Sequence, residues 1–455
     1  MKKKISILLL LFVFLLSSGA ACKTPTVEKV TKPITLNYWR VYDGQDDFAE
    51  IIAKYNAQHP YITINYRKLR FDEYEEELLN AFAEDRGPDI FSIHNTWMKK
   101  YESKIEPLPN QTTMVFEVSK GTIKKELVSE TRVMRSLNLR ELKQNFVDVV
   151  YSDVVINDKI YGLPLSVDTL AMYYNQNLFD QAGIVEIPKY WNRDFQQSVK
   201  KMSKQDLKGN VLQSGVALGG STNIERYSDI LSVLMMQNGA NMMSDSGQVL
   251  FNTVPANSPS GDYNPGLMAL RFYTDFANPI KEVYSWNNNL ENSLNSFASG
   301  KTAIMFGYAY HLPLIKTMAP KLNFMIAPLP QIEGSNVSVN FANYWVEVVS
   351  KKSKYVNEAW NFIQFMSNGE NVSSYLNKTK KPSALRSLVS KQRDDLEIGV
   401  FAEQALTARS WYKGKNANLM EKFFAEMIDA ALADMENKLL DIVNLYASRI
   451  QQTVN

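Results

Sequence analysis

Cysteine and histidine are almost absent from this sequence. Its 455 residues include one cysteine, Cys22, and three histidines, His59, His94 and His311. A single cysteine cannot form an internal disulfide bond, and three scattered histidines do not favour a histidine-built metal site. An excess of charge is missing as well, because 50 Lys and Arg face 48 Asp and Glu and leave a formal net charge of +2. Nucleic-acid-binding proteins usually carry a clear basic excess, so we predict no nucleic-acid partner.

Catalytic signature motifs are missing too. The zinc-protease motif H-E-x-x-H, the nucleophile motif G-x-S-x-G and the dinucleotide motif G-x-G-x-x-G do not occur. Gly300-Lys301-Thr302 looks like the end of a phosphate-binding loop, but Asn295 stands where that motif requires a glycine. The carboxylates Asp153, Asp158 and Asp168 have no partner at a characteristic spacing. The sequence therefore predicts no cofactor and no metal, while a secreted carbohydrate-active enzyme with two distant carboxylates stays open as an alternative.

The longest apolar run lies near the N-terminus and is short. Lysines at positions 2–4 precede the run Ile5–Leu16, and small residues follow it. This order is typical of a secretory signal peptide, and the run is shorter than the roughly 20 apolar residues that span a bilayer. We therefore predict a signal peptide at residues 1–21 and a polar tether at residues 22–33, and we expect the protein to leave the cytoplasm.

The only cysteine directly follows Gly19-Ala20-Ala21, and this segment resembles a bacterial lipobox. In that class of protein the cysteine is lipidated and becomes the mature N-terminus. The resemblance therefore implies that Cys22 anchors the protein on the outer face of the cytoplasmic membrane. Gly19 departs from the pattern, since lipoboxes usually have leucine there. Ordinary cleavage after Ala21, which would release a soluble protein, is the alternative.

Strand and helix patterns alternate from Ile34 onward. The predicted elements are strands at 34–39, 62–66 and 90–93 and helices at 48–55 and 72–82. This order predicts a parallel sheet with right-handed crossovers. Ligands of such sheets bind beyond the carboxyl ends of the strands, which are here Trp39–Gly44 and His94–Trp97.

Four segments resemble, in the same order along the chain, the bacterial extracellular solute-binding proteins of the maltose- and oligosaccharide-binding type. Those proteins feed ATP-binding-cassette importers. The segments are Gly87-Pro88-Asp89, Lys159–Gly183 (KIYGLPLSVDTLAMYYNQNLFDQAG), Ser296–Met305 (SFASGKTAIM) and Asn323–Pro330 (NFMIAPLP). The clearest departure is Pro107–Asn145, which is longer and more basic than the family usually has here. We predict that it is a surface insertion on one lobe, without an assigned role.

The resemblance implies an α/β, two-lobe clamshell like that of periplasmic binding proteins, with the lobes joined by crossover strands. We expect lobe 1 at residues 34–165 plus about 345–384, and lobe 2 at residues 166–344 plus about 385–455. The crossovers are expected at Tyr161–Thr169, at Val339–Val348 and near Lys381–Leu388. Gly162 and Pro164 fit this interpretation, because both residues are unusual in a central strand.

The function that the resemblance implies is capture of a solute outside the cytoplasm. We expect a monomeric, non-enzymatic receptor that binds a sugar or oligosaccharide by hinge closure and delivers it to the membrane permease of an importer. A receptor for another polar solute, such as a polyol, a sugar phosphate or a polyamine, is an alternative within the same class. The carbohydrate-active enzyme is the alternative from another class.

Candidate ligand-binding residues are aromatic or hydrogen-bonding residues at strand ends and in polar loops. A sugar offers apolar ring faces and polar edges, so its site needs both kinds of side chain. The candidates are Trp39, Asp43, Asn95, Trp97, Asp168, Trp286, Tyr308, Trp345 and Trp411. For each aromatic residue, packing within a lobe is the alternative.

Overall fold

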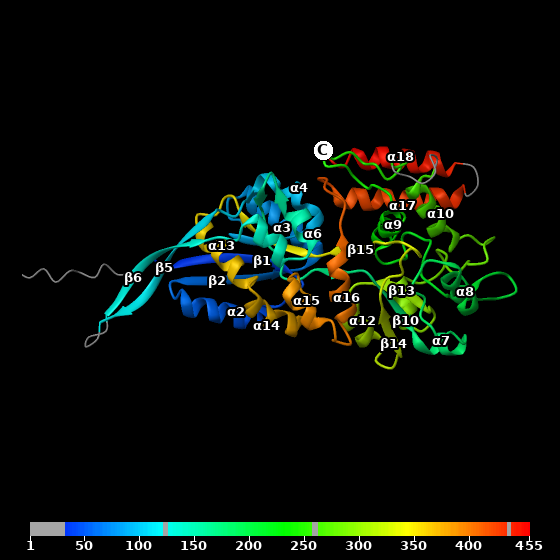
Figure 1. Cartoon of the computed structure of the whole chain (residues 1–455), viewed down its shortest axis with the longest axis horizontal. Helices are drawn as coiled ribbons and strands as arrows, with labels where there is room; N and C mark the ends of the chain where they lie inside the picture. Colours follow the sequence, from blue (N-terminus) through cyan, green and yellow to red (C-terminus); the bar gives the residue numbers. More distant parts are fainter. Residues whose placement is uncertain (1–31, 122–125, 257–262, 435–437) are drawn as a thin grey trace, which may run out of the picture.

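The computed structural model describes residues 32–121, 126–256, 263–434 and 438–455. The predicted signal peptide, the candidate lipidation site Cys22 and most of the tether lie outside these residues. No helix in the described ranges is both long and apolar enough to traverse a lipid bilayer. The described chain forms two lobes that lie end to end along the longest axis of the molecule (Figure 1).

Lobe 1 is built on a five-stranded sheet with the strand order β2-β1-β3-β16-β4. Its strands are β1 (Ile34–Val41), β2 (Ile62–Leu69), β3 (Ile90–His94), β4 (Ile105–Glu106) and β16 (Trp345–Ser350). β1 pairs in parallel with β2 and β3, as the alternating patterns predict, whereas β16 runs antiparallel to β3. The carboxyl ends of β1 and β3 therefore share one edge of the sheet, the edge that faces lobe 2 (Figure 1).

Amphipathic helices pack against this sheet. In α2 (Gln45–Gln58) and α3 (Phe71–Ala83), the residues that recur at helical spacing are the buried ones, and the glutamates of α3 form its outer face. The other helices of this part of the chain are α4 (Met98–Tyr101), α5 (Leu139–Asn145), α6 (Asp148–Val154), α13 (Val356–Met366), α14 (Gly369–Thr379) and α15 (Arg386–Gln392), with the 3₁₀ turns η1 (Asn95–Trp97) and η2 (Glu102–Lys104). The short strands β7 (Val155–Ile156) and β8 (Lys159–Ile160) form a small hairpin.

Lobe 2 contains a smaller antiparallel sheet with the order β13-β10-β14. Its strands are β10 (Ala171–Asn175), β13 (Ile304–Gly307) and β14 (Phe324–Ala327), and β11 (Lys204–Gln205) pairs with β12 (Val211–Gln213) nearby. The helices are α7 (Gln176–Gln181), α8 (Arg193–Met202), α9 (Tyr227–Gln237), α10 (Pro265–Asp275), α11 (Ser293–Ala298), α12 (His311–Met318), α16 (Gly399–Gln404), α17 (Ala417–Ala433) and α18 (Leu439–Gln451), with the 3₁₀ turn η3 (Ala405–Thr407). α17 and α18 pack on each other and on α10.

Short strands connect the two lobes. β9 (Asp168–Thr169), β15 (Asn340–Asn343) and β17 (Ala408–Arg409) form a three-stranded sheet, and β15 leads directly into β16 of lobe 1. Gly162 lies so close to the side chain of Val346 that a Cβ atom at this position would collide with it, which explains the glycine in the first connection. The predicted fold class, two α/β lobes joined by crossover strands, is confirmed.

The predicted surface insertion is dominated by a long β-hairpin. β5 (Gln111–Lys120) and β6 (Glu126–Arg135) pair in antiparallel register along their whole length. The hairpin packs on the body of lobe 1 as far as its middle, where the rings of Phe116 and His59 lie 4.8 Å apart. The hairpin projects from the end of lobe 1 that is farthest from lobe 2 (Figure 1).

Candidate functional site

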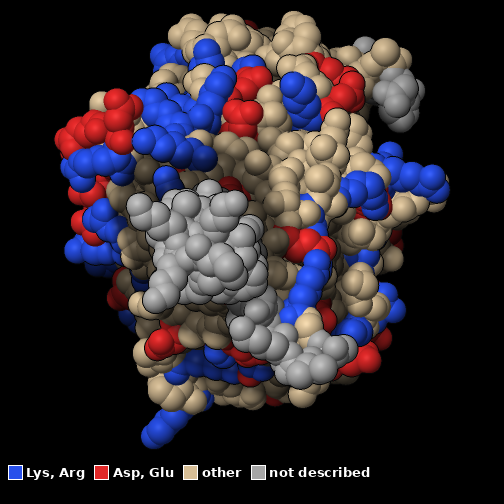
Figure 2. Space-filling view, turned by 90° about the vertical axis from the view of Figure 1, so that its left-hand side faces the viewer, with Lys and Arg blue, Asp and Glu red and all other residues tan. Residues whose placement is uncertain are grey.

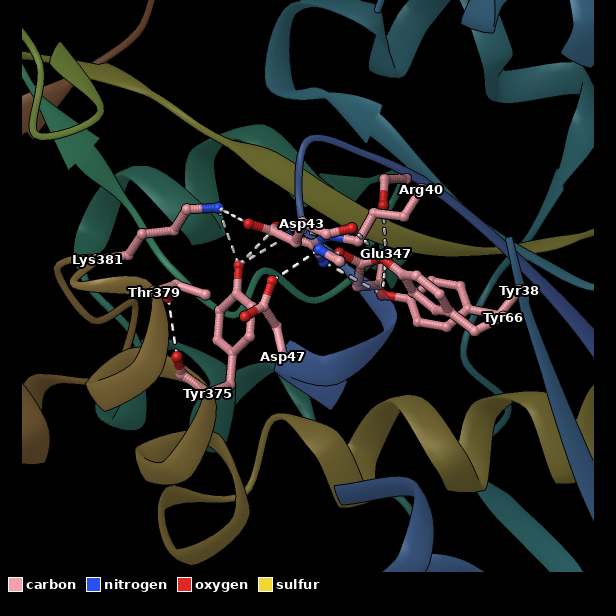
Figure 3. Close-up of polar contacts among 11 residues, drawn as sticks. Tyr38, Arg40, Asp43, Asp47, Tyr66, Glu347, Tyr375, Thr379 and Lys381 are labelled. Carbon is pink, nitrogen blue, oxygen red and sulfur yellow. Dashed lines mark hydrogen bonds and ion pairs between the residues drawn. The ribbon is translucent and has the colours of Figure 1, made fainter. Parts of the chain in front are cut away.

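A buried ion-pair network begins at the carboxyl end of β1 (Figure 3). The Arg40 guanidinium contacts the carboxylate of Glu347 on β16, and its Nη2 lies 2.9 Å from Asp43 Oδ2. Lys381 lies just before Ser383, which bridges Ser166 of the first connection. It pairs with the other oxygen of Asp43, and the Tyr375 hydroxyl donates to Asp43 Oδ2 over 2.9 Å. Two cations thus face two carboxylates, and the network ties β1 to two of the segments that connect the lobes.

The predicted ligand residue Asp43 is a member of this network. Burial by itself would raise the pKa of Asp43, but the positive charges of Arg40 and Lys381 lower it below its ordinary value. Both carboxylate oxygens of Asp43 accept hydrogen bonds from neighbouring side chains. In this structure Asp43 therefore positions the connection between the lobes, and its oxygens do not face an open surface.

An exposed group of aromatic side chains lies beside the network, on the edge of lobe 1 that faces lobe 2. We call Tyr42, Phe71 and Trp345 the aromatic wall. Tyr42 and Phe71 are about half exposed, at 54% and 52%, and their rings are stacked with centroids 5.7 Å apart. Trp345 lies edge-on to both rings and packs on Trp97. The wall leaves flat apolar surface open to a ligand, which a folded protein normally buries.

A charged cluster on lobe 2 is built at the start of α9. The Arg226 guanidinium lies 2.8 Å from the carboxylate of Asp229 and 2.9 Å from that of Glu421. The Tyr308 hydroxyl donates to Asp229 Oδ2 over 2.6 Å, and the ring of Tyr310 stacks on Tyr308 at 5.7 Å. Tyr310 is 42% exposed, so lobe 2 also offers an open aromatic face next to charged groups.

The aromatic wall and the charged cluster lie within electrostatic reach of each other. Burial raises the pKa of Tyr42, and the positive charges of Arg226 and Lys381 oppose this rise. Burial, followed by the charge of Arg226, lowers the pKa of His94 at the end of β3 to about 4, so this imidazole is neutral at neutral pH. Side chains of both lobes therefore lie near one another at this junction, which we call the interlobe site.

Backbone strain occurs on both sides of the interlobe site. Tyr42 and Arg226 adopt left-handed conformations with φ of 66° and 56°, although neither residue is a glycine. Such conformations cost about 1–2 kcal/mol for an L-residue and concentrate at ligand sites, where surrounding contacts hold them in place. The described chain has four other non-glycine residues with positive φ, Asp85, Asn157, Asp158 and Lys380, so the strain at Tyr42 and Arg226 agrees with a ligand site here but does not by itself identify one.

Asp168 lies on β9, where the first connection reaches lobe 2. Its Oδ1 accepts the backbone N–H groups of Thr169, at 2.8 Å, and Ala309, at 3.0 Å. Burial raises the pKa of Asp168 to about 7, although these N–H groups and the charge of Lys381 favour the ionised form. Asp168 therefore changes charge near neutral pH, directly beside the loop that carries Tyr310.

This shifted pKa predicts a dependence of stability on pH. Between about pH 4 and pH 7 the folded protein keeps a proton on Asp168 that the unfolded chain has released, so this group's contribution to stability falls as the pH rises through that window. Asp168→Asn removes the titration and keeps an oxygen acceptor for the two N–H groups. We expect the melting temperature of the variant to gain on that of the wild type between pH 5 and pH 8. Asp245→Asn, at an exposed position of lobe 2, is the matched control, and a constant difference for Asp168→Asn would contradict the assignment.

The remaining predicted residues lie in different environments. Trp97 packs beneath the wall, and Asn95 donates to Asp153 Oδ2 over 3.2 Å while its own Oδ1 is buried without a hydrogen-bond partner among the described residues. Trp39 is buried in lobe 1, where the guanidinium of Arg67 lies 4.6 Å from its ring centroid. These residues support the edge of lobe 1 and do not form its open surface.

Two predicted tryptophans lie in the core of lobe 2. Trp286 is completely buried and donates through Nε1 to Asn223 Oδ1 over 2.9 Å. Trp411 is also buried and donates to Ser232 Oγ over 3.0 Å. The polar neighbours in the sequence suggested open loops, but these polar side chains satisfy the indole N–H groups inside the lobe. Neither ring faces the interlobe site in this structure.

The structure adds residues that the sequence interpretation did not select. These residues of the interlobe site are Tyr42, Phe71, Arg226 and Asp229. Tyr42 stands inside the strand end Trp39–Gly44 that was expected to approach a ligand, so its position was the available signal. Arg226 and Asp229 gave no such signal, because only the folded chain brings the start of α9 to lobe 1. In the described ranges, no group of three or more His, Cys, Asp or Glu side chains is arranged to hold a metal ion.

Comparison with known proteins agrees with this architecture. The profile of the family described as bacterial extracellular solute-binding protein matches residues 43–372. The multiple sugar-binding protein of Streptococcus mutans is 21% identical over 322 residues, which cover 70% of this chain and 72% of that protein. The galactooligosaccharide-binding protein of Bacillus subtilis is 20% identical over 440 residues, or 92% of this chain and 89% of that protein.

Solved structures show the same fold. A cyclo/maltodextrin-binding protein in complex with maltotetraose superimposes with a TM-score of 0.70 at 16% identity, over 93% of this chain and 98% of that chain. A solute-binding protein of an ABC transporter from Thermotoga lettingae, bound to α-D-tagatose, gives a TM-score of 0.64 at 18% identity, over 93% and 100% of the two chains.

Proposed function

Because the chain belongs to the bacterial extracellular solute-binding proteins, we propose that its interlobe site captures a sugar or oligosaccharide for an ATP-binding-cassette importer. The observation that carries this proposal is the pairing of the aromatic wall on lobe 1 with Tyr310 and the charged cluster on lobe 2. A sugar ring stacks its C–H faces on aromatic rings and directs its hydroxyl groups to charged and polar side chains. The names of the relatives, which bind multiple sugars and galactooligosaccharides, support the same class of solute.

Hinge closure supplies the mechanism of capture. The interlobe site takes its side chains from both lobes, so a solute that contacts both makes more contacts when they approach each other. A ligand shifts the equilibrium between the open and the closed arrangement of the lobes only by its difference in affinity for these two states. Closure around the solute would then present one defined shape to the permease.

The function we propose is binding without chemical conversion. Asp229 holds Arg226 and the Tyr308 hydroxyl, and Asp168 holds two backbone N–H groups. These carboxylates position neighbouring groups, whereas a glycosidase needs one carboxyl to donate a proton and a second to act on the sugar or on water. Recovery of the bound oligosaccharide unchanged after long incubation supports a receptor, and release of shorter products would support the enzyme instead.

Trp345 provides the direct test of the interlobe site. Trp345→Ala removes one of the three rings of the aromatic wall. We expect it to weaken oligosaccharide binding tenfold or more, which corresponds to about 1.4 kcal/mol. Calorimetric titration with a panel of neutral oligosaccharides measures the effect. Tyr190→Ala, at a partly exposed tyrosine of lobe 2 outside the site, is the control. Unchanged affinity of Trp345→Ala for an oligosaccharide that the wild type binds would show that the solute binds elsewhere.

We also propose that Cys22 carries the lipid that retains the protein on the outer face of the membrane. The support is the lipobox-like sequence and the family's extracellular location. Cys22→Ser removes the thiol and is expected to move the protein from the membrane fraction to the soluble fraction of fractionated cells. A wild-type protein that is already soluble would contradict lipidation.

A further inference from the structure

The end of lobe 1 that is farthest from lobe 2 carries a group of lysines. Val349 of β16 pairs with Ile90 of β3, and Ile90 pairs with Tyr38 of β1, so the residues after β16 lie level with the start of β1. They include Lys351, Lys352 and Lys354, and the backbone N–H of Lys351 donates to the carbonyl oxygen of Lys104 over 2.9 Å. We call these four residues, Lys104, Lys351, Lys352 and Lys354, the lysine face.

The lysine face keeps most of its charge free. Lys352 pairs with Asp85, but Lys104, Lys351 and Lys354 form no ion pair with any described residue. Among the neighbouring carboxylates, Glu84 pairs with Arg86, whereas Asp89 accepts from the Asn37 N–H and Ser353 Oγ and pairs with no cation among the described residues. Figure 2 looks onto this end of the molecule and shows Lys and Arg side chains gathered over part of it. Lys351 and Lys354 are exposed and Lys104 is partly exposed. Unpaired lysines that reach solvent on one face attract a negatively charged surface.

The path of the chain indicates which surface this is. The described chain starts at Lys32, just before β1, and therefore at the same end of lobe 1. Nine residues lie between Cys22 and Lys32, and the ten steps from one to the other span at most about 35 Å when fully extended. A lipid on Cys22 therefore lies within about 35 Å of the start of β1, at the end of lobe 1 that carries the lysine face.

We propose that the lysine face binds the anionic headgroups of the bilayer and thereby orients the anchored protein. The orientation rests on the proposed anchoring at Cys22, whereas the attraction to anionic lipid does not. Each lysine close to an anionic membrane contributes roughly a fivefold gain in affinity, and salt screens the effect. The β5–β6 hairpin projects from the same end of lobe 1 (Figure 1). The interlobe site, at the opposite edge of lobe 1, then stays clear of the lipid.

Vesicle sedimentation tests the proposal without the lipid anchor. The protein is the mature chain from residue 22 with Cys22→Ser, and the vesicles contain either phosphatidylcholine alone or phosphatidylcholine with phosphatidylglycerol. We expect binding only to the phosphatidylglycerol vesicles, and we expect 0.5 M NaCl to abolish it. The triple variant Lys104→Glu, Lys351→Glu and Lys354→Glu should bind at least tenfold more weakly. The control is the triple variant Lys201→Glu, Lys208→Glu and Lys321→Glu, which has the same change in net charge at exposed lysines of lobe 2. Its affinity for the vesicles should be within threefold of that of the parent protein.

Several results would overturn the proposal. The first is that the protein does not bind phosphatidylglycerol vesicles. The second is that the two triple variants lose the same amount of vesicle affinity. The third is that the protein binds duplex DNA more tightly than it binds the vesicles. Melting curves establish that the variants fold, and the corresponding Lys→Gln variants replace any that do not. The Cys22→Ser protein used in this experiment has no lipid anchor. Its binding to vesicles can therefore be interpreted even if Cys22 of the wild type is not lipidated. A failure of the anchoring proposal would therefore be seen separately, in cell fractionation.

Discussion

Replacing Glu347 by alanine is expected to lower the free energy of unfolding by about 3 kcal/mol or more, because it leaves a buried guanidinium short of its partner. Glu347 is completely buried, and its Oε2 accepts hydrogen bonds from the Tyr38 hydroxyl at 2.8 Å and from Ser92 Oγ at 2.7 Å. Its other oxygen pairs with Arg40, which is 3% exposed. After the substitution only Asp43 remains to balance Arg40, and two hydroxyl groups lose their acceptor.

Urea unfolding followed by circular dichroism measures this change. Glu282→Ala, which breaks the exposed ion pair between Glu282 and Lys200 on lobe 2, is the matched control and should not change the midpoint measurably. If Glu347→Ala unfolded at the same urea concentration as the wild type, the buried network would not stabilise the junction as we describe. The Arg40 and Glu347 double replacement by apolar residues should recover part of the loss, since it removes the unpaired charge.

Replacing Trp286 by alanine is expected to destabilise the protein by about 3–5 kcal/mol, because it opens a cavity in the core of lobe 2. The ring is fully buried, its N–H is bonded to Asn223, and Gly220 packs against its edge. The sequence predicts Trp286 as a candidate ligand residue, with packing inside the lobe as the alternative. In a ligand site the same substitution would weaken binding and change the melting temperature little.

Trp286→Ala and Trp345→Ala therefore form a reciprocal pair. The first should lower the melting temperature strongly and leave oligosaccharide affinity nearly intact at a temperature where the variant is folded. The second should weaken binding and lower the melting temperature less, because Trp345 is partly exposed. Measuring both properties on both variants separates core packing from ligand contact. The opposite pattern would show that Trp286 is the ligand contact.

Local patterns of apolar and polar residues predict much of the fold. The spacing in α2 and α3 and the alternation in β1 and β2 give the parallel part of the lobe 1 sheet, because those elements are local and their buried faces repeat. The antiparallel position of β16 could not be predicted in this way. Its partner β3 lies about 250 residues earlier in the chain, and only tertiary structure brings the two strands together.

The candidate site was predictable at strand ends but not in loops. Tyr42 lies in the segment that follows β1, and the rule for parallel sheets points to that edge. Trp345 begins the antiparallel strand β16, so only the folded chain brings it to the same edge. Trp286 and Trp411 stand among polar residues, but Asn223 and Ser232 act as internal hydrogen-bond partners. A polar neighbour in the sequence therefore does not show that an aromatic ring is exposed.

Small-angle X-ray scattering of the mature protein, with and without a saturating oligosaccharide that calorimetry has shown to bind, tests hinge closure around a sugar most directly. We expect the radius of gyration to decrease when the solute is bound, with Trp345→Ala requiring at least tenfold more solute for the same change. We also expect the solute to be recovered chemically intact. An unchanged radius of gyration at saturation would contradict capture by closure of the two lobes.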